Sequence, residues 1–254
     1  MSARRPHAVV TGGSGRVGRA IARSLARAGL EVVVTWRSDE SGAAQTIAMC
    51  GDDSAASPHG HSAAHRSVAL DLVDLDAVQR VGKELNEWGV DVLVHNASLY
   101  EPQPLGEITA ERVERHLRVH VTAPLLLTQA THHSLRQSAL RGRGAVICMT
   151  DMHLEGRPYA AHAAYFASKA GLDALVRSLA VEMAPDVRVN AVAPGVVAWP
   201  DSAPADMRQR YESRIPLGRP GTPEDAAECV RWLALDAHYV TGESIRIDGG
   251  RWLR

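Results

Sequence analysis

Ala8-Val9-Val10, followed at once by Thr11-Gly12-Gly13-Ser14-Gly15-Arg16-Val17-Gly18, is the stretch that decides the fold class. A short apolar run that stops at a glycine-rich turn is typical of a buried parallel strand. The residues after the turn form an amphipathic helical pattern, with Val17, Ile21 and Leu25 on its apolar face. Small residues let a backbone approach a pyrophosphate, and a helix N-terminus supplies free N–H groups to bind it. The stretch therefore predicts a dinucleotide-binding turn, with a plain tight turn as the alternative.

The rest of the chain repeats the alternation of strand and helix. Further apolar runs predict strands at 31–35, 68–70, 90–94, 145–149, 187–192 and 244–247. Helical patterns lie between them, among them 75–88, 109–130 and 163–175. Such alternation requires right-handed crossovers, so we expect an α/β fold with one doubly wound parallel sheet of Rossmann type, built as a single domain over residues 1–254.

Residues 51–65 break this rhythm, being rich in Ala, Ser, His, Asp and Gly. This composition predicts a surface excursion between the second and third strands. His59, His61 and His65 lie in it, but no neighbouring cysteine or carboxylate supplies a metal-ligand geometry, so no metal is expected.

The composition excludes several classes of partner. A net charge of −1 on 254 residues gives no case for nucleic acid or an anionic membrane. The apolar runs are too short to span a bilayer, and the basic start of the chain lacks the apolar region of a signal peptide. Three cysteines, Cys50, Cys148 and Cys229, are too few for a disulfide framework. We therefore expect a cytoplasmic protein.

Tyr165 and Lys169 stand four apart inside the helical run 163–175. Side chains one turn apart share a helix face, and an ammonium group can lower the pKa of a phenol and ready it to give a proton. The spacing alone is common in helices. Together with the glycine turn, it resembles the short-chain dehydrogenase/reductase family over nearly the whole chain. The resemblance implies that Tyr165 is the acid, that Lys169 holds the nicotinamide ribose, and that both contact the cofactor.

The end of the second predicted strand bears on the choice of cofactor. An NAD enzyme usually carries a carboxylate there for the ribose hydroxyls, whereas this chain has Thr35-Trp36-Arg37-Ser38. A guanidinium and a hydroxyl suit a 2′-phosphate, so Arg37 and Ser38 favour NADP(H). Asp39 and Glu40 follow directly, which leaves a ribose-binding acid open.

The resemblance assigns the remaining cofactor contacts. They are Gly12, Ser14, Arg16 and Val17 in the turn, Asp71 and Leu72 after the third strand, Asn96, Ala97 and Ser98 after the fourth, and Pro194, Gly195 and Val196 after the sixth. Arg16 replaces the middle glycine of the family pattern, as in the pteridine reductase branch. Asp71 has an equally good alternative role as N-cap of the helix at 75–88.

Asp151 occupies the place of the serine that polarises a ketone in most family members. A carboxylate beside a developing alkoxide would raise the barrier by like-charge repulsion. A carboxyl group could instead share a proton with a substrate that is protonated on nitrogen. The residue therefore favours reduction of a C=N bond, with capping of the following turn as the alternative.

A second run, 96–105, resembles the corresponding pteridine reductase segment. It implies that Tyr100 stacks on a flat heteroaromatic ring, with Ser98 as a polar contact. Packing of a loop is the alternative for Tyr100. His162 stands where some pteridine reductases have a substrate-contacting tyrosine, and His120 replaces an asparagine that supports the catalytic lysine through water.

These features predict an NADPH-dependent pteridine reductase that converts a dihydropterin (dihydromonapterin, dihydrobiopterin or dihydrofolate) to its tetrahydro form. Asp151, Tyr165 and Lys169 are the expected catalytic residues, and Ser98, Tyr100, Asp151, His162 and Tyr165 the expected substrate contacts. One alternative is a carbonyl reductase, for example of 3-oxoacyl thioesters. Another is a non-catalytic NADP-sensing regulator, which would not need Tyr165 and Lys169 together. The family resemblance also implies a homotetramer in which Arg254 approaches a neighbouring active site.

Overall fold

The computed structural model describes residues 4–56, 63–199 and 203–254. One seven-stranded sheet runs through it in the order β3-β2-β1-β4-β5-β6-β7, and all neighbouring strands are parallel. The strands are β1 (His7–Val10), β2 (Glu31–Trp36), β3 (Arg66–Ala69), β4 (Val92–His95), β5 (Gly144–Met149), β6 (Val187–Pro194) and β7 (Ser244–Ile247). The predicted doubly wound parallel sheet is confirmed.

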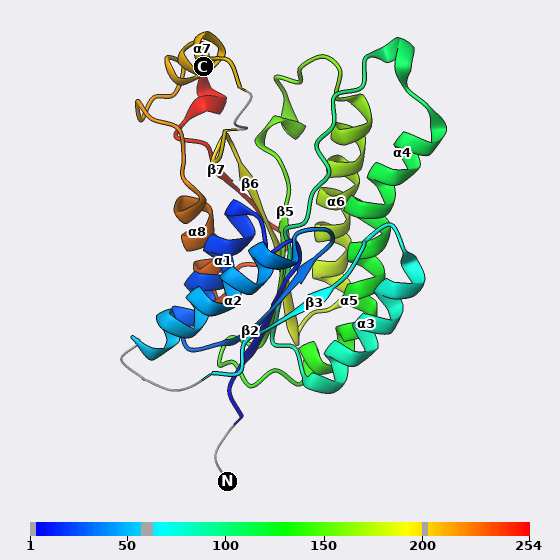
Figure 1. Ribbon diagram of the computed structural model, residues 1–254, viewed down its shortest axis with the longest axis vertical. Coiled ribbons are helices and arrows are strands. Elements are labelled where there is room, and N and C mark those ends of the chain that lie inside the picture. The colour runs from blue at the N-terminus through cyan, green and yellow to red at the C-terminus, as the bar shows by residue number, and fades with distance from the viewer. Residues whose placement is uncertain (1–3, 57–62, 200–202) are drawn as a thin grey trace.

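Helices cover both faces of the sheet (Figure 1). Helices α1, α2 and α8 lie on one side, and α3, α4, α5 and α6 on the other. The helices are α1 (Arg16–Arg27), α2 (Glu40–Ala55), α3 (Leu75–Trp88), α4 (Ala110–Leu117), α5 (Ala123–Arg136), α6 (Ala163–Glu182), α7 (Ala205–Glu212) and α8 (Pro223–Leu235). Short 3-10 turns occupy Leu105–Glu107, Met152–Glu155 and Arg251–Leu253.

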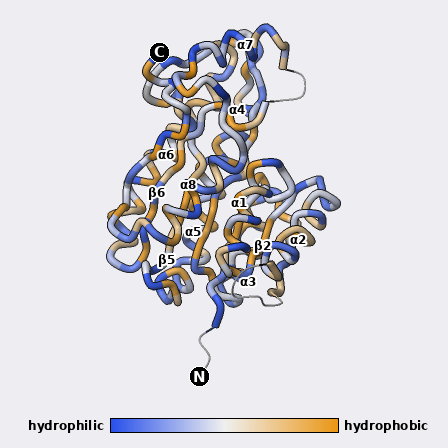
Figure 2. Tube along the Cα trace, turned by 90° about the vertical axis from the view of Figure 1, so that its left-hand side faces the viewer, coloured by the Kyte–Doolittle hydropathy of each residue, from blue (hydrophilic) through white to orange (hydrophobic). Residues whose placement is uncertain are grey.

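The sheet separates two hydrophobic cores. Alternate residues of a strand enter opposite cores: Val9 and Leu93 face the α3 and α5 side, while Val10 and Val94 face the α1 and α8 side. Hydrophobic residues accordingly follow the sheet through the middle of the molecule (Figure 2). Burial on both faces explains why these strands have uninterrupted apolar sequences.

The predicted helix at 109–130 is two helices joined by a π-helical segment. Helix α4 ends at Leu117, Arg118–Thr122 forms the π-helical segment, and α5 continues to Arg136. A π-helical segment is rare and is often found at a functional site. This one contains His120, whose Nε2 lies 3.0 Å from the hydroxyl of Ser98.

The predicted excursion at 51–65 is wrong at its start, because α2 continues to Ala55. The carboxylate of Asp53 accepts from Arg23 at 2.7 Å and from Arg27 at 3.2 Å. These ion pairs join the arginine face of α1 to α2, so a polar segment is held in a helix against a neighbour.

Of the three histidines of this segment, the structure describes His65. His59 and His61 lie outside the described residues. His65 accepts a hydrogen bond from the backbone N–H of Val32 at 3.1 Å, and its Nε2 lies 2.9 Å from the Ser54 hydroxyl. Among the described residues, no group of three or more His, Cys, Asp or Glu could hold a metal ion. No helix in the same ranges is long and apolar enough to cross a membrane.

Gly18→Ala is expected to lower the free energy of unfolding by about 1–3 kcal/mol, the usual cost of overpacking. A Cβ at this position would lie 2.3 Å from the carbonyl oxygen of Gly12 and 2.7 Å from Nδ2 of Asn96. Gly51→Ala is the matched control, because a Cβ there meets nothing within 4 Å and alanine favours a helix by up to about 1 kcal/mol. Urea unfolding measures both; wild-type stability of Gly18→Ala would contradict the close packing of the turn.

Candidate active site

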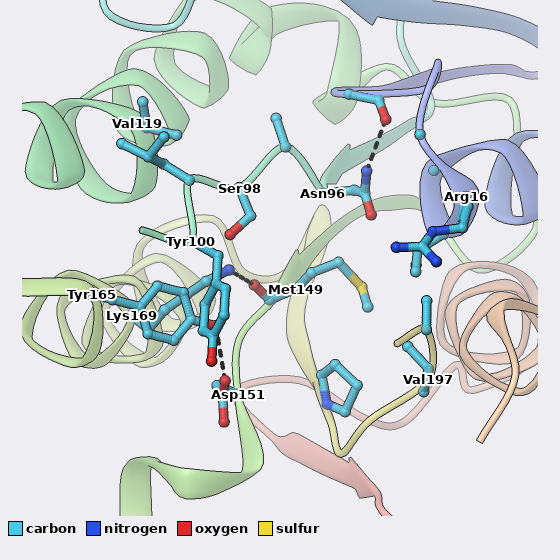
Figure 3. Close-up of a pocket in the computed structure, with 18 of the residues that line it drawn as sticks. Arg16, Asn96, Ser98, Tyr100, Val119, Met149, Asp151, Tyr165, Lys169 and Val197 are labelled. Atoms are coloured by element: carbon cyan, nitrogen blue, oxygen red, sulfur yellow. Dashed lines mark hydrogen bonds between the residues drawn. The ribbon is translucent and has the colours of Figure 1, made fainter. Parts of the chain in front are cut away.

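A cavity of about 810 Å³ opens at the carboxyl ends of the strands. It lies where the strand order reverses between β1 and β4, the usual ligand position in such sheets. Its lining includes all residues predicted to bind the cofactor: Gly12, Ser14, Arg16, Val17, Arg37, Ser38, Asp71, Leu72, Asn96, Ala97, Ser98, Tyr165, Lys169, Pro194, Gly195 and Val196. Asp151 and Tyr100 line the same cavity (Figure 3).

The glycine turn presents a helix N-terminus to this cavity. Gly15 is the N-cap of α1, and in the described structure it has no side-chain cap and no acidic residue in the first turn. The amide of Asn96 donates to the carbonyls of Thr11 at 2.8 Å and Gly12 at 3.2 Å, which holds the turn against β4. Uncapped N–H groups beside small residues fit the pyrophosphate of a dinucleotide.

The acid beside the predicted phosphate site is already used by the fold. Oδ1 of Asp39 accepts the backbone N–H of Gly42 at 2.9 Å and caps α2. Arg37 and Ser38 lie exposed at the rim of the cavity. A cation and a hydroxyl therefore lie together at the rim of the cavity, while the carboxylate next to them caps a helix.

Arg16 and Asp71 have further contacts at the cofactor end of the cavity. The Arg16 guanidinium reaches into the cavity and donates to the carbonyl of Trp199 at 2.5 Å (Figure 3).

Asp71 does not cap α3, so the alternative role of this residue as the N-cap of the helix is wrong. Asp74 caps the helix by accepting from Ala77 at 3.0 Å, and Asp71 accepts from Val73 at 2.9 Å.

Tyr165 and Lys169 come from one face of α6 and are both buried. The Tyr165 hydroxyl donates to Oδ2 of Asp151 at 2.8 Å, and Nζ of Lys169 donates to the carbonyl of Met149 at 2.6 Å (Figure 3). Burial lowers the pKa of Lys169 to about 8. Burial, and after it the Asp151 carboxylate, raise the pKa of Tyr165 well above its ordinary value. The predicted lowering of the Tyr165 pKa is therefore wrong for this structure, and Tyr165 keeps its proton at neutral pH.

Asp151 also caps the turn that follows it, so the alternative role and the site role coexist. Its Oδ1 accepts both the backbone N–H and Nδ1 of His153, each at 2.8 Å. Burial raises the pKa of Asp151, but the hydrogen bonds from His153 and Tyr165 outweigh it and leave the pKa below its ordinary value. The carboxylate is therefore ionised at neutral pH. His153 was not predicted from the sequence, although an Asp whose side chain accepts from the backbone N–H two residues on is a common turn pattern.

An aromatic wall closes the side of the cavity next to Tyr165. Tyr100 meets the Tyr165 ring edge-on at 5.0 Å, and its hydroxyl donates to the hydroxyl of Tyr159 at 3.0 Å. Tyr159 lines the cavity, and nothing in the sequence singled it out. His162 does not line it: the ring stacks behind Tyr100 at 4.6 Å, and Nδ1 lies 2.9 Å from the carbonyl of Ala160. The predicted direct contact of His162 with substrate is therefore corrected to support of Tyr100.

His120 connects the loop after β4 to α6. The backbone N–H of Leu99 donates to Nε2 at 3.1 Å, so Nε2 is the acceptor and the proton is on Nδ1. Nδ1 lies 2.8 Å from the Ser168 hydroxyl, and Ser98 lies 3.0 Å from Nε2. Burial lowers the pKa of His120 to about 2. A neutral imidazole thus fixes the position of Ser98.

Comparison with known proteins decides the family. Residues 14–251 match a family described as Enoyl-(Acyl carrier protein) reductase. The chain belongs to the short-chain dehydrogenase/reductase family. It is therefore an oxidoreductase of a family that uses NAD(P)H.

Its relatives differ in their names. The 3beta-hydroxysteroid dehydrogenase 1 of Eggerthella lenta is 34% identical over 252 residues, covering 96% of this chain and 93% of that protein. The dihydromonapterin reductase of Enterobacter sp. (strain 638) is 29% identical over 248 residues, covering 96% and 95%. A solved short-chain dehydrogenase from Burkholderia cenocepacia in complex with NADP superposes with a TM-score of 0.84 at 26% identity, covering 97% of each chain.

Asp151→Asn is expected to lower the pKa of Tyr165, because it removes the negative charge that, after burial, raises this pKa most. Phenolate absorbance checks this, with the curve of Tyr165→Phe subtracted to isolate Tyr165. The phenolate should form at lower pH in Asp151→Asn than in the wild type. Asp71→Asn, another carboxylate of the cavity wall, is the control and should leave the curve unchanged; identical curves for all three would refute the coupling.

Proposed function

We propose that this protein is an NADPH-dependent pteridine reductase that converts a dihydropterin to its tetrahydro form. One observation carries the proposal: the hydroxyl of Tyr165 donates to an ionised Asp151 instead of to a neutral serine. The name of the dihydromonapterin reductase among the relatives supports the same substrate class.

The charge of Asp151 discriminates between a carbonyl and an imine substrate. A ketone that accepts hydride becomes an alkoxide, and a carboxylate bonded to the proton donor opposes that charge. A ring C=N bond is reduced at carbon and protonated at nitrogen, so its product is a neutral amine. An anionic Asp151 therefore suits the imine.

The residues of the site divide the work of the reaction. When bound, NADPH supplies the hydride. Tyr165, kept protonated by burial and by Asp151, gives its proton to the ring nitrogen. Lys169 provides the buried ammonium for the nicotinamide ribose. Tyr100, half exposed beside Tyr165, offers a ring face against which a flat pterin stacks.

The choice of NADPH over NADH rests on Arg37 and Ser38 at the rim, with Asp39 engaged as the cap of α2. A guanidinium binds a phosphate through charge-assisted bonds that a ribose hydroxyl does not offer. As in the family, we further propose that the protein works in the cytoplasm as a homotetramer.

Arg37→Ala is expected to weaken NADPH binding by about 10- to 100-fold and to leave NADH binding nearly unchanged, because one charged hydrogen-bond partner contributes about 1.5–3 kcal/mol. Fluorescence titration with both cofactors measures the effect. Arg141→Ala is the control. Arg141 is exposed and lies before the amino end of β5, whereas the cavity opens at the carboxyl ends of the strands. Equal loss for both cofactors would place Arg37 away from the phosphate.

A carbonyl reductase is the second candidate. The relative named as a hydroxysteroid dehydrogenase, at 34% identity, favours it. The two candidates differ in the role of Asp151, because a serine at this position would serve a ketone as well or better.

Asp151→Ser is expected to cut dihydropterin reduction by about 10²-fold, the lower end of what a positioned proton-transfer group contributes. It should spare or raise any ketone reduction, because it removes the charge that opposes an alkoxide. NADPH oxidation with dihydromonapterin, dihydrobiopterin, dihydrofolate and an acetoacetyl thioester measures both. If the wild type turns over the thioester well and ignores every pterin, the pterin proposal is wrong.

A further inference from the structure

His153 completes a chain of three hydrogen-bonded groups that starts at the proposed acid. The Tyr165 hydroxyl donates to Oδ2 of Asp151, and Nδ1 of His153 lies 2.8 Å from Oδ1 of the same carboxylate. Because Asp151 is ionised, Nδ1 of His153 is the donor. The imidazole lines the cavity, and 12% of its side chain is exposed.

Several contacts orient the imidazole toward Asp151. Its backbone N–H binds the same Oδ1, Tyr159 meets its ring edge-on at 5.1 Å, and Phe166 lies at 6.3 Å. The titratable groups that face the ring among the described residues are Asp151 and Tyr159. Burial raises the pKa of Tyr159 far above neutrality, so the Asp151 carboxylate is the charge that His153 meets.

Each reduction consumes one proton, and Tyr165 must regain it after giving it up. Tyr165 is 6% exposed and its hydroxyl is bonded to Asp151, so the hydrogen-bonded path along which a proton returns runs through that carboxylate. Lys169 donates to the carbonyl of Met149, and His120 is neutral with its ring nitrogens bonded inside the protein. Asp151 is the group bonded to the Tyr165 hydroxyl, and it leads to His153.

We propose that His153 is a proton-relay residue that recharges Tyr165 through Asp151 after each hydride transfer. The identity of the substrate rests on the function proposed above; the relay requires only that Tyr165 is the acid.

One proton passes along the relay in each turnover. Tyr165 gives its proton to the substrate and becomes a phenolate. The His153 imidazolium loses its Nδ1 proton to Oδ1 of Asp151, the carboxyl group turns about its Cβ–Cγ bond, and the proton passes to the phenolate. The imidazole, now without a proton on Nδ1, turns about its Cβ–Cγ bond to present this atom to the cavity, takes one proton from water there and turns back. One proton enters from solvent per turnover, as the reduction requires, and Asp151 is an anion again at the end.

Two substitutions at His153 separate relay from simple support. His153→Asn keeps a side-chain N–H near the position of Nδ1 but cannot carry a proton. His153→Ala removes both functions and leaves space for free imidazole. A relay predicts that kcat falls by about 10²-fold in both variants with KM values unchanged, and that added imidazole restores His153→Ala but not His153→Asn. His133→Ala, which removes an exposed histidine of α5, is the control and should respond to neither.

The assay uses NADPH with dihydrobiopterin and, in parallel, with diacetyl. Thermal melting and NADPH binding establish that each variant is folded. Wild-type kcat in His153→Asn, or failure of imidazole to restore a folded His153→Ala, overturns the relay. Turnover of diacetyl without any pterin would reject the proposed substrate, while the comparison of variants on diacetyl would still decide the relay. A ¹³C NMR titration gives an independent reading: the pKa of Asp151 should rise in His153→Ala, and an unchanged pKa overturns the proposal without any turnover.

Discussion

The joint between the ends of β1 and β4 is the constraint on which the site depends. The Thr11 hydroxyl accepts the backbone N–H groups of Asn96 at 3.0 Å and Ala97 at 3.1 Å, while the Asn96 amide holds the carbonyls of the glycine turn. Helices leave the sheet toward opposite faces at this point, so a crevice opens between them. Without this joint, the N-terminus of α1 would not face the groups that follow β4 and β5.

The chemistry of the site comes from how one buried negative charge is compensated. Asp151 receives three hydrogen bonds, two from His153 and one from Tyr165. Burial of a carboxylate is costly unless such partners are present. The same bonds keep Asp151 ionised and Tyr165 protonated, so the stability of the site and its readiness to donate a proton have one cause.

Much of the fold could be predicted from the sequence, because a parallel sheet buried on both faces produces continuous apolar strands separated by amphipathic helices. The polar half of α2 could not, because contacts with a neighbouring helix, among them the ion pairs of Asp53 with α1, are not visible in the sequence. In the site, Tyr165 stood out by its spacing from Lys169, and Asp151 stood out because the family resemblance places a serine at its position. Tyr159 and His153 did not, because only the turn after β5 and the loop before α6 bring them to the cavity. His162 was predicted to contact substrate and does not line the cavity, for the same reason. The conformation of the loop before α6 decides which of its aromatic side chains faces the cavity.

The π-helical segment Arg118–Thr122 limits which insertions and deletions the chain can accept between α4 and α5. A π turn holds about one residue more than an α turn, so the segment acts as a one-residue insertion between α4 and α5. Each α-helical residue turns the chain by about 100°, and everything after an insertion is rotated by that angle. Loss of one residue here would turn either Leu127 away from the core or His120 away from Ser168. Insertions and deletions in this stretch are therefore limited by two faces at once, the one that packs on the sheet and the one that holds the active-site loop.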